Sequence, residues 1–341
     1  MLSLDYSHDY LQCSYNNWCS EFQNYVNEHV VIPVPDDVLL YLMSDVMVLP
    51  KNSVVSSRSN NESDIIWGTT EEELEEPNFF DFDEKLKEAI QYLGGKVFIK
   101  LNWSAPKDAS WITSTRSLCC SDPADIYLLL KSSSYISDDL SILKKCSESR
   151  HEVPCCLVLK KWEEIHPGTE YRCFVLNKNL VGISQRDVTS YFKFISDNKK
   201  SISESISDFF ISHVKSKISL DSYHFDLVIG PGKKIILIDI GVLNEKNNCL
   251  MFSWKELEEK KVCKQSIKAN SGEEHPSYGE EQNSLRESSS LEPEFRYIDE
   301  FTNVTQNPCK HFGIPVDALH FCSGEKNVAD YVQDEILNNR L

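Results

Sequence analysis

Two aspartates, Asp226 and Asp239, are the residues of this sequence best placed to act together chemically. They lie in two aliphatic runs separated by Pro231 and Gly232, a pattern that predicts a β-hairpin. A loop from 231 to 234 sets the aspartates directly opposite each other and a loop two residues tighter makes them diagonal neighbours, so both registers place them on one face. Two carboxylates about 5 Å apart repel each other unless a cation lies between them. Mg²⁺ with a bound phosphate is the natural cation; the alternative is an edge hairpin whose aspartates point into solvent.

A second hairpin is expected from 170 to 187, with a turn at Asn177, Lys178 and Asn179. A three-residue loop sets Glu170 opposite Arg186 and Arg172 opposite Ser184, which brings both arginines to one face. Two guanidinium groups on one sheet face suit the oxygens of a phosphate. The alternative is a cross-strand ladder of ion pairs on a solvated sheet.

Lysines come from two further places in the chain. The strand expected at 96–103 places Lys100 and Asn102 on one face, and a lysine in an apolar strand is costly to bury without an anion. The loop that follows, from Ser104 to Asp108, is stiffened by a proline and is expected to shape a pocket wall. The alternative for Lys100 is that its ammonium group reaches solvent.

Three residues after the apolar strand 155–159 resemble a hinge for adenine. Lys160, Lys161 and Trp162 form a polar and aromatic linker on which a base can stack and hydrogen-bond. Packing of Trp162 in the core is the alternative. Together with the arginines and the paired aspartates, these lysines make the inventory of a nucleoside triphosphate site between two sheets. The sequence contains neither GxxxxGK[ST] nor GxGxxG, which argues against a P-loop, a protein kinase or a Rossmann site.

Composition restricts the class of protein. The chain has 341 residues, a formal net charge of -18 and 12 cysteines, none of them in a CxxC spacing. The acidic excess repels phosphate backbones, so we expect a basic protein partner and no nucleic acid. The cysteine spacing favours reduced thiols in the cytosol or nucleus over zinc or disulfides. The longest aliphatic segment, 38–49, is too short to span a bilayer, and we expect a soluble protein.

Periodicity predicts the elements that position these residues. Helices are expected within 1–30, at 83–95 with Leu86, Ile90 and Leu93 on one stripe, and at 200–217. The charged, serine-rich segment 258–294 is expected to be disordered, and a short ordered tail is expected at about 313–337.

Three parts of the sequence resemble the cell division cycle protein 123 family, also called the D123 family. They are KVFIKLNWSAPKDASWI at 96–112, LVLKKWEEIHPGTEYRCFVLNKNLVGISQRD at 157–187, and FDLVIG, IILIDI and LMFSWKEL between 225 and 257. The strings KLNWSAPKDA, YRCFV and GISQRD are characteristic of the family, and weaker similarity extends the resemblance over nearly the whole chain.

The resemblance implies an α+β protein with an ATP-grasp fold, in which two lobes with largely antiparallel sheets enclose a nucleotide cleft. It implies the cofactors ATP and Mg²⁺. The implied activity is that of a cytoplasmic assembly chaperone, monomeric on its own, which binds the gamma subunit of eukaryotic translation initiation factor 2 so that the alpha subunit can join. No turnover reaction is implied. The implied segments are 1–95 and 96–160 for the first lobe, 161–257 for the second, 258–294 disordered, and 295–341 as a tail that packs on the body and extends the partner surface.

The resemblance also implies which residues bind the ligands. Asp226 and Asp239 are expected to hold the metal. The residues expected at ATP are Lys100, Asn102, Ala105, Asp108, Lys160, Lys161, Trp162, Glu170, Arg172, Arg186, Asp187, Asp226 and Asp239.

This sequence departs from the family pattern at one position that affects the metal. The family usually has Asp-x-Asn-Pro-Phe where this chain has Asp-Ile-Gly-Val-Leu at 239–243, so Gly241 replaces an amide. Water can substitute, because Mg²⁺ keeps several waters, but weaker metal affinity or loss of one metal site is expected. Two other functions stay open: a carboxylate ligase or kinase-like enzyme that uses the same residues, and a scaffold that has lost nucleotide binding.

Overall fold

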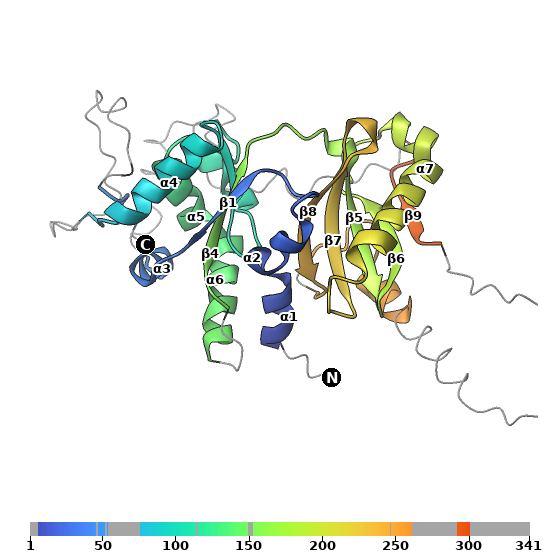
Figure 1. The fold of residues 1–341 in the computed structure, drawn as a ribbon, viewed down its shortest axis with the longest axis horizontal. Helices are drawn as coiled ribbons and strands as arrows, with labels where there is room; N and C mark the ends of the chain where they lie inside the picture. Colours follow the sequence, from blue (N-terminus) through green and yellow to red (C-terminus); the bar gives the residue numbers. More distant parts are fainter. Residues whose placement is uncertain are drawn as a thin grey trace, which may run out of the picture. The chain divides into compact units, whose positions relative to one another are not determined.

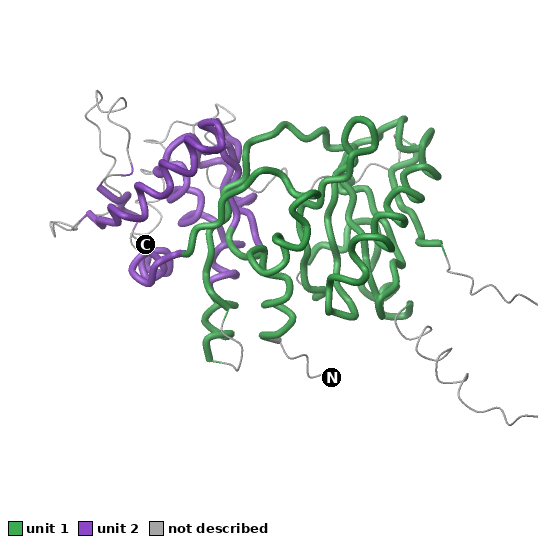
Figure 2. The backbone as a smooth tube through the Cα atoms, in the orientation of Figure 1, with its two compact units in different colours: residues 1–33, 101–103, 141–306 green, residues 34–100, 104–140, 307–341 purple. Residues whose placement is uncertain are grey.

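The computed structural model describes residues 6–45, 47–51, 53, 76–113, 115–148, 153–245, 247–260 and 292–300. Most of the segment expected to be disordered and the whole tail expected at 313–337 therefore lie outside the described residues. The chain divides into two compact units: unit 1 is 1–33, 101–103 and 141–306, and unit 2 is 34–100, 104–140 and 307–341 (Figure 2). The segment boundaries drawn from the sequence stay predictions. Within the described residues, no helix has both the length and the apolar character needed to cross a membrane.

Unit 1 is built on a five-stranded sheet of strand order β8-β7-β5-β6-β9 (Figure 1). The strands are β5 (Glu170–Leu176), β6 (Asn179–Gln185), β7 (Tyr223–Ile229), β8 (Ile235–Val242) and β9 (Glu294–Arg296). The first four pair antiparallel, and β9 pairs with β6 in parallel. Both hairpins predicted from the sequence are therefore confirmed. The three-residue turn expected at 177–179 is wrong: Asn179 already pairs with Leu176, and a bulge at Val181 restores the pairing of Arg172 with Ser184. Strand β9 is an addition that the sequence pattern did not indicate.

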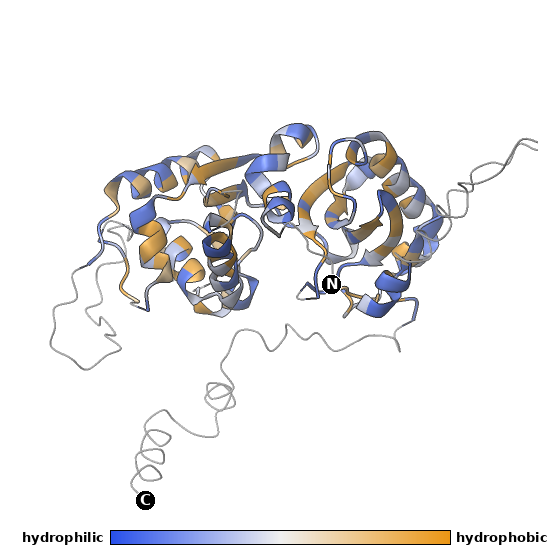
Figure 3. Ribbon diagram, turned by 90° about the horizontal axis from the view of Figure 1, so that it is seen from below, coloured by the Kyte–Doolittle hydropathy of each residue, from blue (hydrophilic) through white to orange (hydrophobic). Residues whose placement is uncertain are grey.

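Helix α7 (Lys193–Phe209) continues into a π-helical turn (Phe210–Val214), which confirms the helix expected at 200–217. Its apolar stripe is buried, and Phe210 stacks on Phe225 of β7 with ring centroids 6.1 Å apart. The 3-10 turns Pro167–Thr169 and Pro231–Lys233 precede β5 and β8. Because the strands are largely hydrophobic while the helices also carry hydrophilic surfaces (Figure 3), burial of the apolar faces accounts for this packing.

The N-terminal part of unit 1 contains α1 (Tyr6–Cys13), α2 (Tyr15–Trp18), a 3-10 turn (Cys19–Phe22) and β1 (His29–Pro33). Strand β1 pairs antiparallel with β4 (Cys156–Lys161), and this pairing places His29 opposite Lys160. Tyr15 and Trp18 are buried in this part of unit 1.

Unit 2 contains α3 (Asp36–Met43), α4 (Phe80–Tyr92), α5 (Pro123–Ser132) and a 3-10 segment (Lys107–Ile112), and helix α6 (Ser134–Ser147) begins in it. Strand β2 (Val97–Lys100) pairs antiparallel with β3 (Cys119–Cys120). Helix α4 buries the stripe predicted for it and ends where Gly94 and Gly95 adopt φ values of 92° and 85°, which glycine tolerates without strain.

Candidate functional site

The paired aspartates lie directly opposite each other, but the chain reaches that register in an unexpected way. Ile229 pairs with Ile235 and Leu227 with Leu237, and the register then shifts by one residue so that Asp226 pairs with Asp239. A β-bulge at Ile238 produces the shift. Without this extra residue Ile238 would face Asp226, and Asp239 would point to the other side of the sheet. The predicted juxtaposition is therefore confirmed, and it depends on the bulge.

Lys160 stabilises the bulge. Its Nζ donates a hydrogen bond to the carbonyl oxygen of Ile238 at 2.8 Å and lies 4.3 Å from the ring centroid of Tyr15. The lysine side chain is buried, and a buried ammonium group needs such partners. Of the residues expected at the adenine hinge, Lys160 thus anchors β4 to β8, while Lys161 pairs with Glu28 at 3.2 Å and Trp162 is half-buried.

Arg172 supplies the positive charge beside the aspartates. It lies opposite Asp226 on one side and Ser184 on the other. Its Nε and Nη2 donate to Oδ1 and Oδ2 of Asp226, both at 2.7 Å, and its Nη1 donates to the carbonyl oxygen of Asn248 at 2.7 Å. The guanidinium group therefore relieves the repulsion for which the sequence analysis invoked a metal.

The electrostatics of Asp226 follow from this arrangement. Burial by itself raises the pKa of Asp226, but the charges of Arg172 and Arg186 and the hydrogen bonds from Arg172 outweigh it and hold the pKa well below its usual range. Asp226 is consequently an anion at every physiological pH. The ladder of ion pairs considered from the sequence exists, but its central pair, Arg172 and Asp226, is buried instead of solvated, and Arg186 and Glu170 are half-buried.

Arg186 completes the ladder with a buried donor that lacks a hydrogen bond. Its Nε lies 3.5 Å from Oδ2 of Asp226 and 3.6 Å from Oε1 of Glu170, which is too long for either contact to be a hydrogen bond. Among the described residues this Nε has no hydrogen-bond partner. A buried N–H without a partner marks a place where a ligand oxygen or a water belongs.

His224 explains why position 241 carries no side chain. It lies two residues before Asp226, on the same face, and pairs with Gly241. A Cβ atom placed on Gly241 would lie 2.4 Å from Cε1 of the His224 ring. Burial, followed by the charge of Arg172, lowers the pKa of His224 to about 3, so the ring is neutral. The imidazole thus covers the position where the family pattern has an amide.

The residues in place do not form a ready site for Mg²⁺. Both oxygens of Asp226 accept hydrogen bonds from Arg172, and Gly241 offers no side-chain oxygen. No cluster of three or more His, Cys, Asp or Glu residues with metal-binding geometry occurs in the part of the chain that the structure describes. Mg²⁺ requires near-octahedral oxygen ligands, and these residues do not supply them.

Other residues expected at the nucleotide have structural partners. The Asn102 amide donates to Oγ of Ser14 at 2.9 Å and to the carbonyl oxygen of Pro154 at 2.7 Å, while its Oδ1 accepts from the backbone N–H of Cys156 at 3.0 Å. Asp187 accepts from the backbone and the hydroxyl of Thr189 and shapes the turn after β6. Asn102 therefore joins the segment 101–103 to α2 and β4, a role that its position on the strand did not reveal.

Three of the expected residues belong to unit 2, whereas the five-stranded sheet belongs to unit 1. Lys100 is buried at the end of β2, and Ala105 is half-buried in the loop that follows. Asp108 accepts hydrogen bonds from the backbone N–H of Ser134 at 2.7 Å and from the hydroxyl of Ser133 at 2.5 Å. An anion at the start of α6 satisfies its free N–H groups and favours its dipole, so Asp108 has a structural role there.

Sequence reasoning missed two residues of the site. His224 was detectable, because strand alternation places residue 224 on the same face as Asp226. Gln185 was not, because its partner Ile298 lies two residues after β9, more than a hundred residues later in the chain.

The fold and this ladder define an α+β protein with largely antiparallel sheets, as predicted, and with a buried row of acidic and basic side chains across the sheet of unit 1. The family model described as D123 matches residues 18–322, which is most of the chain. The chain therefore belongs to the D123 family.

Individual relatives agree with this membership. A "Translation initiation factor eIF2 assembly protein" from Xenopus tropicalis is 35% identical over 327 residues, which cover 92% of this chain and 92% of the relative. The solved structure of Cdc123 from Schizosaccharomyces pombe matches with a TM-score of 0.61 and 32% identity, over 76% of this chain and 94% of that chain. A RimK domain ATP-grasp protein from Sphaerobacter thermophilus matches with a TM-score of 0.35 and 12% identity, over 75% of this chain and 65% of that chain, a likeness too low to support a further argument.

Proposed function

We propose that this chain is an ATP-binding assembly chaperone of the cytoplasm, which binds the gamma subunit of eukaryotic translation initiation factor 2 and promotes joining of the alpha subunit. The similarity to eIF2 assembly proteins over nearly their whole length supports the assembly role. The acidic balance of the chain suits a basic face on the partner.

The observation that carries nucleotide binding is the Nε of Arg186. This N–H is buried beside Asp226 and Glu170 and has no hydrogen bond among the described residues. A phosphate oxygen would satisfy it with a charge-assisted hydrogen bond. Arg172 is less available, because two of its nitrogens are engaged by Asp226 and the third by Asn248. We therefore assign the main phosphate contact to Arg186 and the support of the ladder to Arg172.

Calorimetry with purified protein tests the nucleotide proposal. ATP is titrated with and without Mg²⁺ into wild type, Arg186→Met and Arg296→Met. The matched control, Arg296, is an arginine of the same sheet that pairs with Glu256 and Glu294. We expect Arg186→Met to weaken ATP binding at least tenfold and Arg296→Met to weaken it less. Equal affinity in wild type and Arg186→Met would contradict the assignment.

Co-purification tests the partner. The tagged full-length chain is incubated with separately purified alpha, beta and gamma subunits of the factor, with and without ATP. We expect capture of gamma alone among the single subunits, and addition of alpha to the captured complex when both are present. Failure to retain gamma at micromolar concentrations would refute the assembly proposal, whatever the outcome with ATP.

One observation favours a second candidate, a scaffold without nucleotide binding. His224 covers Gly241 so closely that no side chain fits there, which removes a polar group from the site. If the scaffold is correct, gamma is captured equally with and without ATP and calorimetry detects no nucleotide. The same two experiments therefore separate the candidates.

A further inference from the structure

The side chain of Gln185 connects the turn after β6 to the C-terminal strand. Its Nε2 donates to the carbonyl oxygens of Asp187 at 2.5 Å and Ser190 at 2.7 Å. Its Oε1 accepts from the backbone N–H of Ile298 at 3.1 Å. Gln185 is fully buried, so each of these bonds would be costly to lose. Arg186 is the residue between Gln185 and Asp187 in the chain.

Strand β9 docks on β6 through a short ladder and a group of side chains. Glu294, Phe295 and Arg296 pair with Gly182, Ile183 and Ser184. Phe295 packs edge-on against Tyr171 with ring centroids 5.8 Å apart, and Ile298 is buried.

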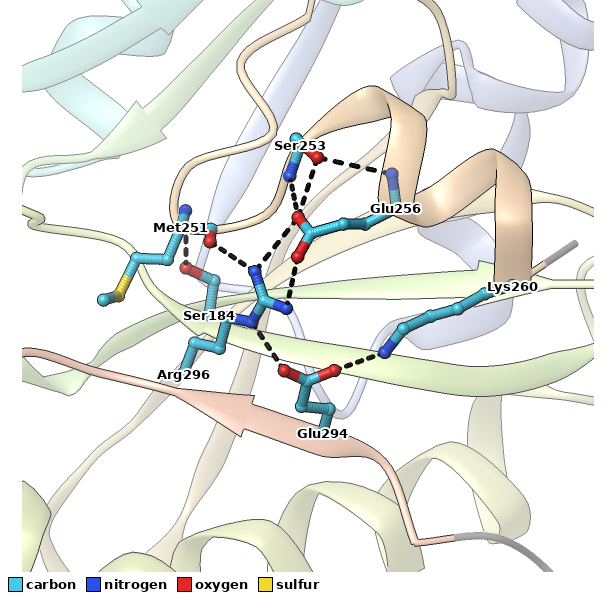
Figure 4. Close-up of polar contacts among 7 residues, drawn as sticks. All are labelled: Ser184, Met251, Ser253, Glu256, Lys260, Glu294 and Arg296. Carbon is cyan, nitrogen blue, oxygen red and sulfur yellow. Dashed lines mark hydrogen bonds and ion pairs between the residues drawn. The ribbon is translucent and has the colours of Figure 1, made fainter.

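On the other face of the sheet, charged side chains of β9 contact residues 251–260 (Figure 4). Arg296 binds Glu256 at 2.8 Å and the carbonyl oxygen of Met251 at 2.8 Å, and Lys260 pairs with Glu294. A three-residue edge strand is weak by itself, so its position depends on these few contacts.

We propose that Gln185 is a positioning residue that couples docking of β9 to nucleotide binding at Arg186. This inference rests on the proposed function. When β9 is docked, the N–H of Ile298 fixes the orientation of the Gln185 amide, and the amide in turn holds the turn from 186 to 190. When β9 leaves, the buried Oε1 loses its donor and the amide is free to turn, so the carbonyl oxygens of Asp187 and Ser190 lose their fixed partner.

The direction of the coupling follows from these bonds. A nucleotide held by Arg186 binds best when the turn 186–190 is fixed, so it favours the docked form of β9. Linkage requires the effect to be reciprocal: ATP stabilises the docking of β9 by the same factor by which docking strengthens ATP binding.

The first test measures the reciprocity on the full chain. Phe295→Ala loosens β9 without touching Arg186, and Phe209→Ala, a buried phenylalanine of α7, is the matched control for lost stability. We expect Phe295→Ala to weaken ATP binding by about fivefold or more and Phe209→Ala to leave it within twofold. ATP should slow hydrogen exchange at 294–298 in wild type by a similar factor. Equal ATP affinity in both variants, or no change in exchange, would overturn the proposal.

The second test needs no nucleotide, so it stands even if the proposed function fails. Hydrogen exchange at 186–190 is measured in the free protein for wild type, Phe295→Ala, Phe209→Ala and Gln185→Glu. Glutamate keeps the acceptor for Ile298 but loses the two donated bonds. We expect faster exchange at 186–190 in Phe295→Ala and Gln185→Glu, and wild-type exchange there in Phe209→Ala. An unchanged turn in Phe295→Ala would show that β9 and the turn are independent. A wild type that does not bind ATP would refute nucleotide binding and its coupling to β9, while these exchange rates would still decide whether β9 positions the turn.

Discussion

Two arginines in one cross-strand row show how burial changes the contribution of an arginine–carboxylate pair to stability. The row crosses the sheet of unit 1 through Asp239, Asp226, Arg172, Ser184 and Arg296. Arg172 and Arg296 each bind one carboxylate with two nitrogens and one backbone carbonyl oxygen with a single nitrogen. The side chains of Arg172 and Asp226 are 8% and 7% exposed, while those of Arg296 and Glu256 are 25% and 41% exposed.

The two pairs differ in what happens to the carboxylate when its arginine is removed. At Asp226, water cannot replace Arg172, so a charge would remain buried. At Glu256, water solvates the carboxylate as soon as Arg296 leaves. We therefore expect the Arg172 pair to control stability and the Arg296 pair to fix the position of β9.

The largest effect is expected from Arg172→Met. This change leaves buried Asp226 without its hydrogen-bonded cation, with only Arg186 at 3.5 Å to compensate its charge, and should lower the free energy of unfolding by about 3 to 5 kcal/mol, as measured by urea denaturation. The control is the double variant Arg172→Met with Asp226→Leu, which replaces the pair by apolar side chains and should recover most of the loss. A double variant no more stable than the single one would show that the charge of Asp226 is not the cause.

The second-largest effect is expected from Gly241→Ala, which tests the close packing of His224 on Gly241. Gly241→Ala places a methyl group 2.4 Å from the imidazole and should destabilise the protein by about 1 to 3 kcal/mol. Gly230→Ala is the control, because the nearest atom to its added Cβ is 3.5 Å away. Adding His224→Ala to Gly241→Ala should cost less than the sum of the two single changes, since it removes the clash. Strict additivity would contradict the contact.

Lys160→Met tests the support of the β-bulge. The variant keeps most of the side-chain volume but leaves the carbonyl oxygen of Ile238 without its donor, at a cost of about 1 to 3 kcal/mol. Lys161→Met, one residue later, is the control, because Lys161 is exposed and pairs with a half-exposed glutamate. Similar losses in both variants would mean that the bond to the bulge is unimportant.

The bulge also marks the limit of what the sequence reveals. The hairpins, the helices α4 and α7 and the pairing of Arg172 with Ser184 followed from alternation, turn residues and helical spacing. The cation beside Asp226 did not, because the choice between a metal and Arg172 depends on which strand lies next to β7. The structural partners of Asn102 and Asp108 could not be predicted either, because Pro154 and Ser134 lie far along the chain.

The smallest effect is expected at the exposed end of the row and depends on pH. Hydrogen bonds from Arg296 and Ser253 lower the pKa of Glu256 to about 2, below its value of 4.5 in the unfolded chain. A depressed folded pKa gives stabilisation that is fully present above about pH 4.5 and is lost as the pH falls through about 2. Glu256→Gln should therefore be slightly less stable than wild type at pH 6, and the difference should shrink between pH 4.5 and 2.

The urea midpoints of the two proteins, measured at pH 6 and pH 3, check this expectation. Because Glu256 is solvated, we expect the difference at pH 6 to be much smaller than the loss caused by Arg172→Met. A difference at pH 6 as large as that loss would remove the contrast between the two arginines, since an exposed pair would then stabilise the sheet as strongly as a buried one. A difference that grows toward pH 3 would instead show that the folded pKa of Glu256 is raised, and that Arg296 is not its main partner.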